Sequence, residues 1–285
     1  MNSWESLDKM VKKEIIRKEF SKKPTELSIC KIHVKILEAL NFSIKQIKQD
    51  LYSEIIDEDS KKSIVIGAAC SRVDKYIERA VQTMSLYEQS IITIKIPLDD
   101  KGINYDLLSL EVMLKEVEFY KPIWQWSLDE KYNVALKYKD NGVELFKAKR
   151  HMDAYYRFSK ACKILITLEP LDFNAPILKD VWNLRHILYN NMAECHLIRK
   201  NYGHVLTLCS KILNKENHNV KALYRRGVAY GNLKDYENAV NDLKNAIFFD
   251  PKNAKAQEQF NIYNELWKVS VQRYQDIVRK MFKTK

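Results

Sequence analysis

The sequence predicts an α+β domain followed by an all-α array of helical hairpins. Over residues 24–120, short runs of alternating apolar and polar residues indicate strands with one buried face. From about Leu128 onward, apolar residues recur with helical spacing instead. The chain has only 6 Gly and 6 Pro among its 285 residues, which favours a mainly helical second part and argues against long flexible linkers.

Residues 1–23 are predicted to form an N-terminal extension. Trp4, Leu7, Met10, Val11 and Ile15 fall on one side of a helical wheel, and Pro24 then interrupts the pattern after two lysines. We therefore expect a docking helix that precedes the first domain.

Strand periodicity is clearest in three runs of the first domain, over residues 30–36, 92–96 and 108–114. Residues 62–69 form a further strand-like run. Residues 74–84 have the pattern of a short amphipathic helix, which suits packing on a sheet. Together these elements predict a small α+β domain over residues 24–120.

A repeated helix–turn–helix unit is the strongest pattern of the second half. Small residues recur where two antiparallel helices cross, and a proline follows the second helix because it has no N–H with which to continue it. In residues 219–253 these positions are held by Leu223, Gly227, Tyr230, Ala239, Leu243, Ala246 and Pro251. The same spacing recurs upstream, first in Tyr138, Gly142, Leu145, Ala154, Phe158 and Ala161, and more weakly in Ala193, Val205 and Cys209.

This pattern is that of the tetratricopeptide repeat (TPR), and it predicts a three-repeat superhelix over residues 121–252. One such unit cannot bury its own apolar face, so a long helix over residues 253–285 is expected to cap the array. The first and second repeats lie further apart than the usual period of about 34 residues. The extra residues fall within 168–182, where two prolines predict a loop.

Five positions on the first helices of the hairpins are expected to line a common groove. Lys139 and Val143 belong to the first repeat, Asn191 to the second, and Lys221 and Arg225 to the third. Lys221 and Arg225 are four residues apart, which places both cations on one helical face. Two like charges repel there unless an anion bridges them, so the pattern predicts an anionic ligand.

In this respect the sequence resembles the "carboxylate clamp" TPR domains of co-chaperones. The resemblance implies that Lys139, Asn191, Lys221 and Arg225 grip the C-terminal carboxylate and last Asp side chain of an EEVD tail of heat-shock protein 90 or 70. Val143 departs from the Asn that is usual at the fifth position. The missing Asn is a neutral hydrogen-bond partner, and neutral hydrogen bonds contribute less than the charge-assisted bonds that remain. Its loss is therefore expected to lower the affinity for the peptide more than to change the binding mode.

The chain also resembles immunophilins of the FK506-binding protein family. The segments around KALYRRGVA, DPKNAKAQEQ and VRKMF are similar to the C-terminal half of that family, and residues 73–97 resemble a segment of its prolyl isomerase domain. Ile77 replaces the Trp that floors the isomerase pocket, and Asp74 replaces an Ile beside it. Tyr76 and Ala80 replace two Gly, and the loop before the last strand shortens to residues 98–106. The resemblance therefore implies a degenerate domain without isomerase activity, kept for client or partner binding; an active isomerase is the alternative.

Composition favours a folded protein of the cytoplasm and nucleus. The five cysteines have no metal-ligand or disulfide spacing, and no apolar run is long enough to cross a bilayer. No motif for a cofactor, metal or catalytic site is found. The net charge of +11 fits binding of an acidic peptide. Nucleic acid is the alternative ligand, but it is disfavoured because Lys and Arg are mixed with 37 acidic residues along the chain. The basic C-terminal helix also suits calmodulin, although capping explains its apolar face more simply.

Overall fold

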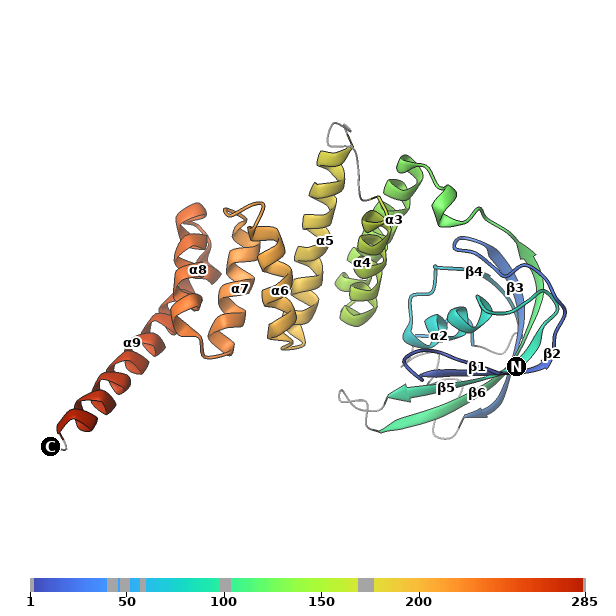
Figure 1. The fold of residues 1–285 in the computed structure, drawn as a ribbon, viewed down its shortest axis with the longest axis horizontal. Coiled ribbons are helices and arrows are strands. Elements are labelled where there is room, and N and C mark those ends of the chain that lie inside the picture. The colour runs from blue at the N-terminus through green and yellow to red at the C-terminus, as the bar shows by residue number, and fades with distance from the viewer. Residues whose placement is uncertain are drawn as a thin grey trace. The chain divides into compact units, whose positions relative to one another are not determined.

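The computed structural model describes residues 3–39, 46, 52–56, 60–97, 104–168 and 177–283, and the side chains of these residues up to 282. The chain divides into two compact units, Met1–Ser127 and Leu128–Lys285. The predicted class, an α+β unit followed by an all-α unit, is confirmed (Figure 1).

The first unit is built on a six-stranded antiparallel sheet in the order β1-β2-β5-β6-β3-β4. The strands are β1 (Ser3–Glu5), β2 (Val11–Arg17), β3 (Ile29–Ala39), β4 (Lys61–Val65), β5 (Gln89–Pro97) and β6 (Tyr105–Glu118). The predicted runs at residues 30–36, 92–96 and 108–114 lie within β3, β5 and β6, and the run at residues 62–69 overlaps β4. Alternate side chains of β3, β5 and β6 are buried in one apolar core, as the period of two requires.

The helix α2 (Arg72–Val81) lies in the curve of this sheet (Figure 1). Ser71 caps it by accepting a hydrogen bond from the Asp74 backbone N–H at 3.0 Å. Its apolar side, which includes Val73, Ile77 and Val81, belongs to the core. The short helix expected over residues 74–84 is therefore present, slightly earlier in the chain.

The helix predicted for residues 1–23 is wrong, because this segment contributes β1 and β2 to the sheet. Lys9 adopts a positive φ of 55° in the turn between them. Val11 and Lys13 point inward, so the true period is two. The Lys13 ammonium can be buried because it lies 2.6 Å from Glu88 Oε1 and 3.1 Å from the Thr83 carbonyl oxygen. Because Lys13 is polar but faces inward, it interrupts the alternation of apolar and polar residues by which a strand is predicted.

The segment after β6 belongs to the first unit, which ends at Ser127 and not at the predicted residue 120. A single 3₁₀ turn, η1 (Ile123–Gln125), precedes Trp126. The indole N–H of Trp126 donates to the Lys121 carbonyl oxygen at 2.8 Å, and its ring contacts Tyr120 edge to face.

The second unit consists of antiparallel helical hairpins followed by a long helix. The pairs are α3 (Leu128–Lys147) with α4 (His151–Ile166), α5 (Leu178–Ile198) with α6 (Tyr202–Leu213), and α7 (Val220–Asn232) with α8 (Tyr236–Phe249). The small residues predicted at the helix crossings are buried, including Ala154, Ala193 and Ala239. The loop predicted within residues 168–182 lies mostly outside the described residues, and α5 begins at Leu178.

Each hairpin turns through a lysine with positive φ. Lys149, Lys200 and Lys234 have φ values of 61°, 61° and 65°, at the same offset within each repeat. This shared geometry shows that the weak second repeat is built like the other two.

The helix α9 (Ala254–Lys283) packs against α8 and α7 with its first part only. Ala256 and Tyr263 are buried there, and Asn232 donates to the Tyr263 hydroxyl at 3.1 Å. This part covers the end of the repeats, as predicted from residue 253 onward. Farther along, Tyr274, Ile277 and Phe282 are exposed. Calmodulin binding by that segment stays a prediction.

Candidate functional site

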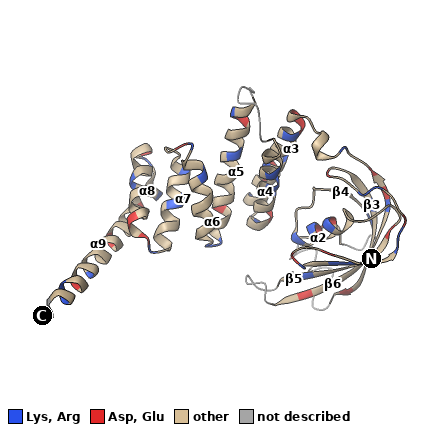
Figure 2. Cartoon of the chain, viewed as in Figure 1, with Lys and Arg blue, Asp and Glu red and all other residues tan. Residues whose placement is uncertain are grey.

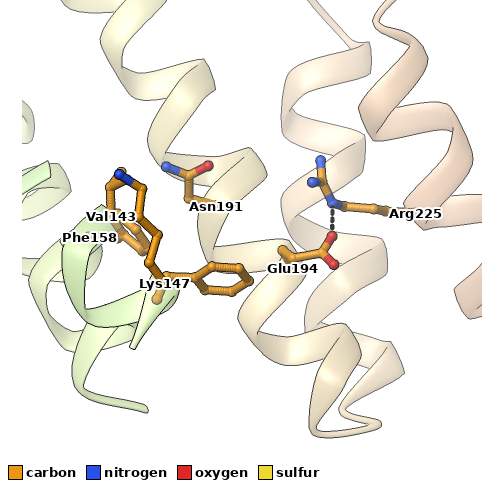
Figure 3. A pocket seen from close by; sticks show the side chains of 7 residues that line it. Val143, Lys147, Phe158, Asn191, Glu194 and Arg225 are labelled. Carbon is orange, nitrogen blue, oxygen red and sulfur yellow. Dashed lines mark hydrogen bonds and ion pairs between the residues drawn. The ribbon is translucent and has the colours of Figure 1, made fainter. Parts of the chain in front are cut away.

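A pocket of about 170 Å³ lies between the first helices of the three hairpins and α4. Its lining residues are Val143, Phe146, Lys147, Phe158, Asn191, Glu194 and Arg225 (Figure 3). Three of the five positions expected in the groove, Val143, Asn191 and Arg225, therefore meet in one place. Three apolar side chains and Lys147 line the pocket from α3 and α4, and polar side chains line it from α5 and α7.

Arg225 is held by two acceptors on α5. Its Nε lies 2.5 Å from Glu194 Oε2, the ion pair drawn in Figure 3, and its Nη1 donates to Asn190 Oδ1 at 2.9 Å. The side chain of Arg225 is 14% exposed and that of Glu194 is 33% exposed. The guanidinium is thus fixed at the pocket wall before any ligand arrives.

A chain of polar contacts continues from Asn190 to the start of α7. Asn190 lies 3.5 Å from Asn219, whose side chain caps α7 by accepting from the Ala222 backbone N–H at 3.1 Å. Asn219 also donates to Glu216 at 2.9 Å, and His186 Nδ1 lies 2.6 Å from the other Glu216 oxygen. These contacts, first that with Asn219, lower the pKa of Glu216. The network ties α5 to the end of α7 that carries Lys221 and Arg225.

The neighbouring Arg226 has a different role. It binds both carboxylate oxygens of Asp242 on α8 at 2.7 Å. This hydrogen bonding raises the pKa of Arg226, and the pair joins the two helices of the third repeat. Arg226 therefore belongs to the scaffold, whereas Arg225 faces the pocket.

Lys139 and Lys221 do not line this pocket. Lys139 forms an ion pair with its neighbour Asp140 at 2.6 Å and is 24% exposed. Lys221 is exposed in the first turn of α7. Their assignment to a ligand thus stays a prediction, with both ammonium groups on flexible stems.

The sequence reasoning missed Glu194, together with Phe146, Lys147 and Phe158. Glu194 stands three residues after Asn191, a spacing that places both on one face of a helix. This spacing could have identified Glu194 as a groove residue from the sequence. Glu194 also lies close to the Tyr224 phenol, whose pKa is raised first by burial and then by this carboxylate.

In the first unit, the positions expected around an isomerase pocket are occupied differently. Ile77 is fully buried in the core of the unit, and Ala80 lies beside it on α2. The Asp74 carboxylate accepts from the Ser53 hydroxyl at 2.5 Å and from the Glu54 backbone N–H at 2.8 Å. Burial raises the pKa of Asp74 although these hydrogen bonds oppose the shift. Residues 98–103 of the shortened loop lie outside the described residues.

Within the described ranges, no group of three or more His, Cys, Asp or Glu side chains could hold a metal ion. All five cysteines lie within the described residues, and none of them forms a disulfide bond. Burial raises the pKa of Cys30, Cys195 and Cys209 to about 12, so these thiols are unreactive packing groups. None of the helices in the described part of the chain combines the length and apolar character needed to span a membrane.

Family models match the chain in three segments. Residues 4–119 match the BDBT FKBP-like N-terminal model, residues 127–207 match the TPR domain of Bride of doubletime-like proteins, and residues 220–253 match a tetratricopeptide repeat. The first match begins within β1, which agrees with the inclusion of β1 and β2 in the sheet.

The chain is 28% identical to Bride of doubletime of Drosophila melanogaster, over 98% of this chain and 97% of that protein. It is 35% identical to the human FK506-binding protein-like protein over 56% of this chain, but spans only 43% of that protein. It is 26% identical to the mouse peptidyl-prolyl cis-trans isomerase FKBP4 over 72% of this chain and 46% of that enzyme.

Two solved structures share the fold. The crystal structure of residues 1–211 of CG17282 superposes with a TM-score of 0.56 at 26% identity, over 71% of this chain and 95% of that one. The C-terminal TPR-containing domain of a Plasmodium falciparum protein described as an FK506-binding protein gives a TM-score of 0.50 at 27% identity, over 53% and 99%. The chain thus belongs to the FKBP-like proteins with tetratricopeptide repeats, with a BDBT FKBP-like domain followed by TPR domains.

Proposed function

We propose that this protein is a co-chaperone adaptor whose TPR groove binds the acidic C-terminus of heat-shock protein 90 or 70. The observation that carries this proposal is the pocket in which Asn191 and Arg225 converge from neighbouring hairpins. An amide and a guanidinium at a partly exposed wall are suited to a peptide carboxylate. Lys139 and Lys221 are long enough to add charge to the same ligand from adjacent turns.

The charge of the second unit supports a peptide more than a nucleic acid. In the view of Figure 2, Lys and Arg positions alternate with Asp and Glu positions along the helices. A groove with Lys147 and Arg225 in its lining fits a short acidic segment, whose on-rate these cations would increase by electrostatic attraction.

The first unit is proposed to be a non-catalytic module that holds a client or partner. In place of the aromatic floor expected of an isomerase, Ile77 is part of the core, and Asp74 forms hydrogen bonds with Ser53 and Glu54. A prolyl ring would find no aromatic floor at these positions. The alternative, an active isomerase, rests on similarity to FKBP4 and would show as peptide isomerisation above background. The adaptor is proposed to act in the cytoplasm and nucleus.

Calorimetry with an EEVD-ending peptide tests the binding proposal. The same peptide with an amidated C-terminus is the control for the ligand, and we expect it to bind much more weakly. Lys221→Ala should weaken binding by about 2 kcal/mol or more, because a charged partner of the carboxylate is lost. Lys244→Ala, on the exposed side of α8, should not change it. Equal affinities for the free and amidated peptides would refute the proposal.

A further inference from the structure

An acidic residue stands inside the pocket whose ligand is expected to be an anion. Glu194 lines the pocket beside Asn191 and Arg225, and its carboxylate is already paired with the Arg225 Nε (Figure 3). Any second carboxylate that enters this pocket must compete with Glu194 for the same guanidinium.

The geometry of Arg225 makes this competition effective. Arg side chains bind carboxylates best through two parallel N–H groups. Glu194 holds the Nε group and Asn190 holds an Nη1 group. Asn190 is itself anchored to Asn219 at the cap of α7, so the guanidinium cannot turn toward a ligand without breaking the polar network. A ligand therefore meets an Arg225 that is already partly satisfied.

The rest of the pocket does not offset this loss. Lys147 also lines the pocket, but its side chain is 68% exposed and its ammonium already lies 2.9 Å from Glu144 Oε1. Val143, Phe146 and Phe158 provide apolar surface without a hydrogen-bond donor. Glu194 and an incoming carboxylate would repel each other in a partly desolvated site, where Coulomb interactions exceed those in water. An amide or ammonium group in the same position would instead donate to Glu194.

We propose that Glu194 is a specificity-determining residue of the groove and acts on the side chain of the last residue of a bound peptide. This rests on the proposed function, in which Asn191 and the lysines bind the terminal carboxylate itself. Glu194 removes the advantage of an acidic last side chain. The groove then accepts a C-terminal residue with an amide or ammonium side chain at least as well as aspartate.

Three peptides and four proteins test this inference by calorimetry on the full chain. The peptides share one sequence and end in Asp, in Asn, or in Asp with an amidated terminus. The proteins are the wild type, Glu194→Gln and Glu237→Gln; Glu237 lies exposed on α8 and carries the same charge change away from the pocket. The fourth protein is Glu194→Met, which removes the charge and the acceptor together.

In the wild type and in Glu237→Gln, the Asn peptide should bind at least as tightly as the Asp peptide. In Glu194→Gln and Glu194→Met, the ratio of the two affinities should move toward Asp by roughly tenfold, a difference of about 1.4 kcal/mol. This ratio is measured within each protein, so a small loss of stability in a variant does not disturb it.

The outcomes separate the inference from the proposed function. If the amidated peptide binds as well as its free acid, the carboxylate is not recognised and both fail. If the free acid is preferred but the ratio of Asp to Asn is the same in all four proteins, only the role of Glu194 is refuted.

Discussion

Arg225 and Arg226 are adjacent in sequence, and we expect their substitution to separate peptide binding from folding. Arg226 joins α7 to α8 through two hydrogen bonds of 2.7 Å to Asp242, and its Nη1 lies 3.3 Å from Ser210 Oγ. The side chain of Asp242 is only 5% exposed, so Arg226→Gln leaves a buried carboxylate without its partner.

The expected size of the effect follows from this burial. Removing one member of a buried ion pair costs about 3–5 kcal/mol, because the remaining charge stays desolvated. Arg226 is itself 23% exposed, which lets water reach part of the site, so the lower end, about 3 kcal/mol, is expected. Arg225→Gln should cost at most about 1 kcal/mol of stability, since its partner Glu194 is accessible to solvent.

Urea denaturation of the full chain, followed by the helical circular dichroism signal, measures the stabilities. Arg273→Gln is the matched control, because Arg273 is exposed on α9. Calorimetry with the EEVD-ending peptide completes the comparison. We expect Arg225→Gln to bind at least tenfold more weakly, about 1.4 kcal/mol, because Glu194 loses its counter-charge and then repels the peptide carboxylates. The denaturation midpoint of this variant should stay near that of the wild type.

The reasoning would be refuted by the opposite pattern. If Arg225→Gln unfolds at lower urea than Arg226→Gln, then the arginine that we place in the pocket is part of the scaffold. If Arg226→Gln has the wild-type midpoint, the Asp242 pair does not hold the third repeat together.

Three further predictions concern stability. A methyl group at Gly227 would lie 2.8 Å from Leu243 Cγ and 3.2 Å from a backbone oxygen, so Gly227→Ala should destabilise the protein by about 1–3 kcal/mol. A methyl group at Gly203 meets no atom within 4 Å, so Gly203→Ala should stabilise α6 by up to about 1 kcal/mol in the same urea titration. Asp74→Ala removes the acceptor of Ser53 and Glu54 and should cost about 2 kcal/mol, with faster hydrogen exchange at the Glu54 amide. Because burial raises the pKa of Cys209 from 9.0 to about 12, the unfolded thiol loses its proton first, and stability should fall between these pH values by about 1.4 kcal/mol per pH unit. Cys209→Ala should lose this part of the slope.

Each of these has a clear contrary result. Shifts of the two glycine variants in the same direction would contradict the packing argument. Unchanged hydrogen exchange in Asp74→Ala would mean that this carboxylate does not hold residues 53–56. If the free energy of unfolding falls with rising pH at the same rate in Cys209→Ala and in the wild type, then groups other than Cys209 cause the fall.

Most of the fold could be predicted because apolar periodicity reports burial directly. The inward residues of β3, β5 and β6 are apolar throughout the predicted runs, and the small residues of the repeats mark the helix crossings. The N-terminal strands could not be predicted in this way. Lys13 faces inward only because Glu88, far along the chain, supplies its counter-charge, and no local pattern reveals that partner.

The candidate site was predictable in position and not in detail. The repeat register places Val143, Asn191 and Arg225 on facing helices, which the structure brings to one pocket. The Glu194 pair depends on the distance between α5 and α7 and on side-chain rotamers, which spacing along one helix does not determine.

Val143 and Glu194 both lower the number of hydrogen-bond donors that the pocket offers to a carboxylate, although their chemistry differs. Val143 places an apolar side chain where a donor would serve a carboxylate, and Glu194 occupies a donor that is present. Both reduce the number of N–H groups that a second carboxylate could find. Binding then depends mainly on the terminal carboxylate and on Lys139 and Lys221, which are long and partly solvated. Affinity for an EEVD-ending peptide should therefore fall steeply with salt, because exposed charges are screened within about 10 Å at 0.1 M. An affinity that is insensitive to salt would mean that the buried pocket, and not the exposed lysines, provides most of the binding energy.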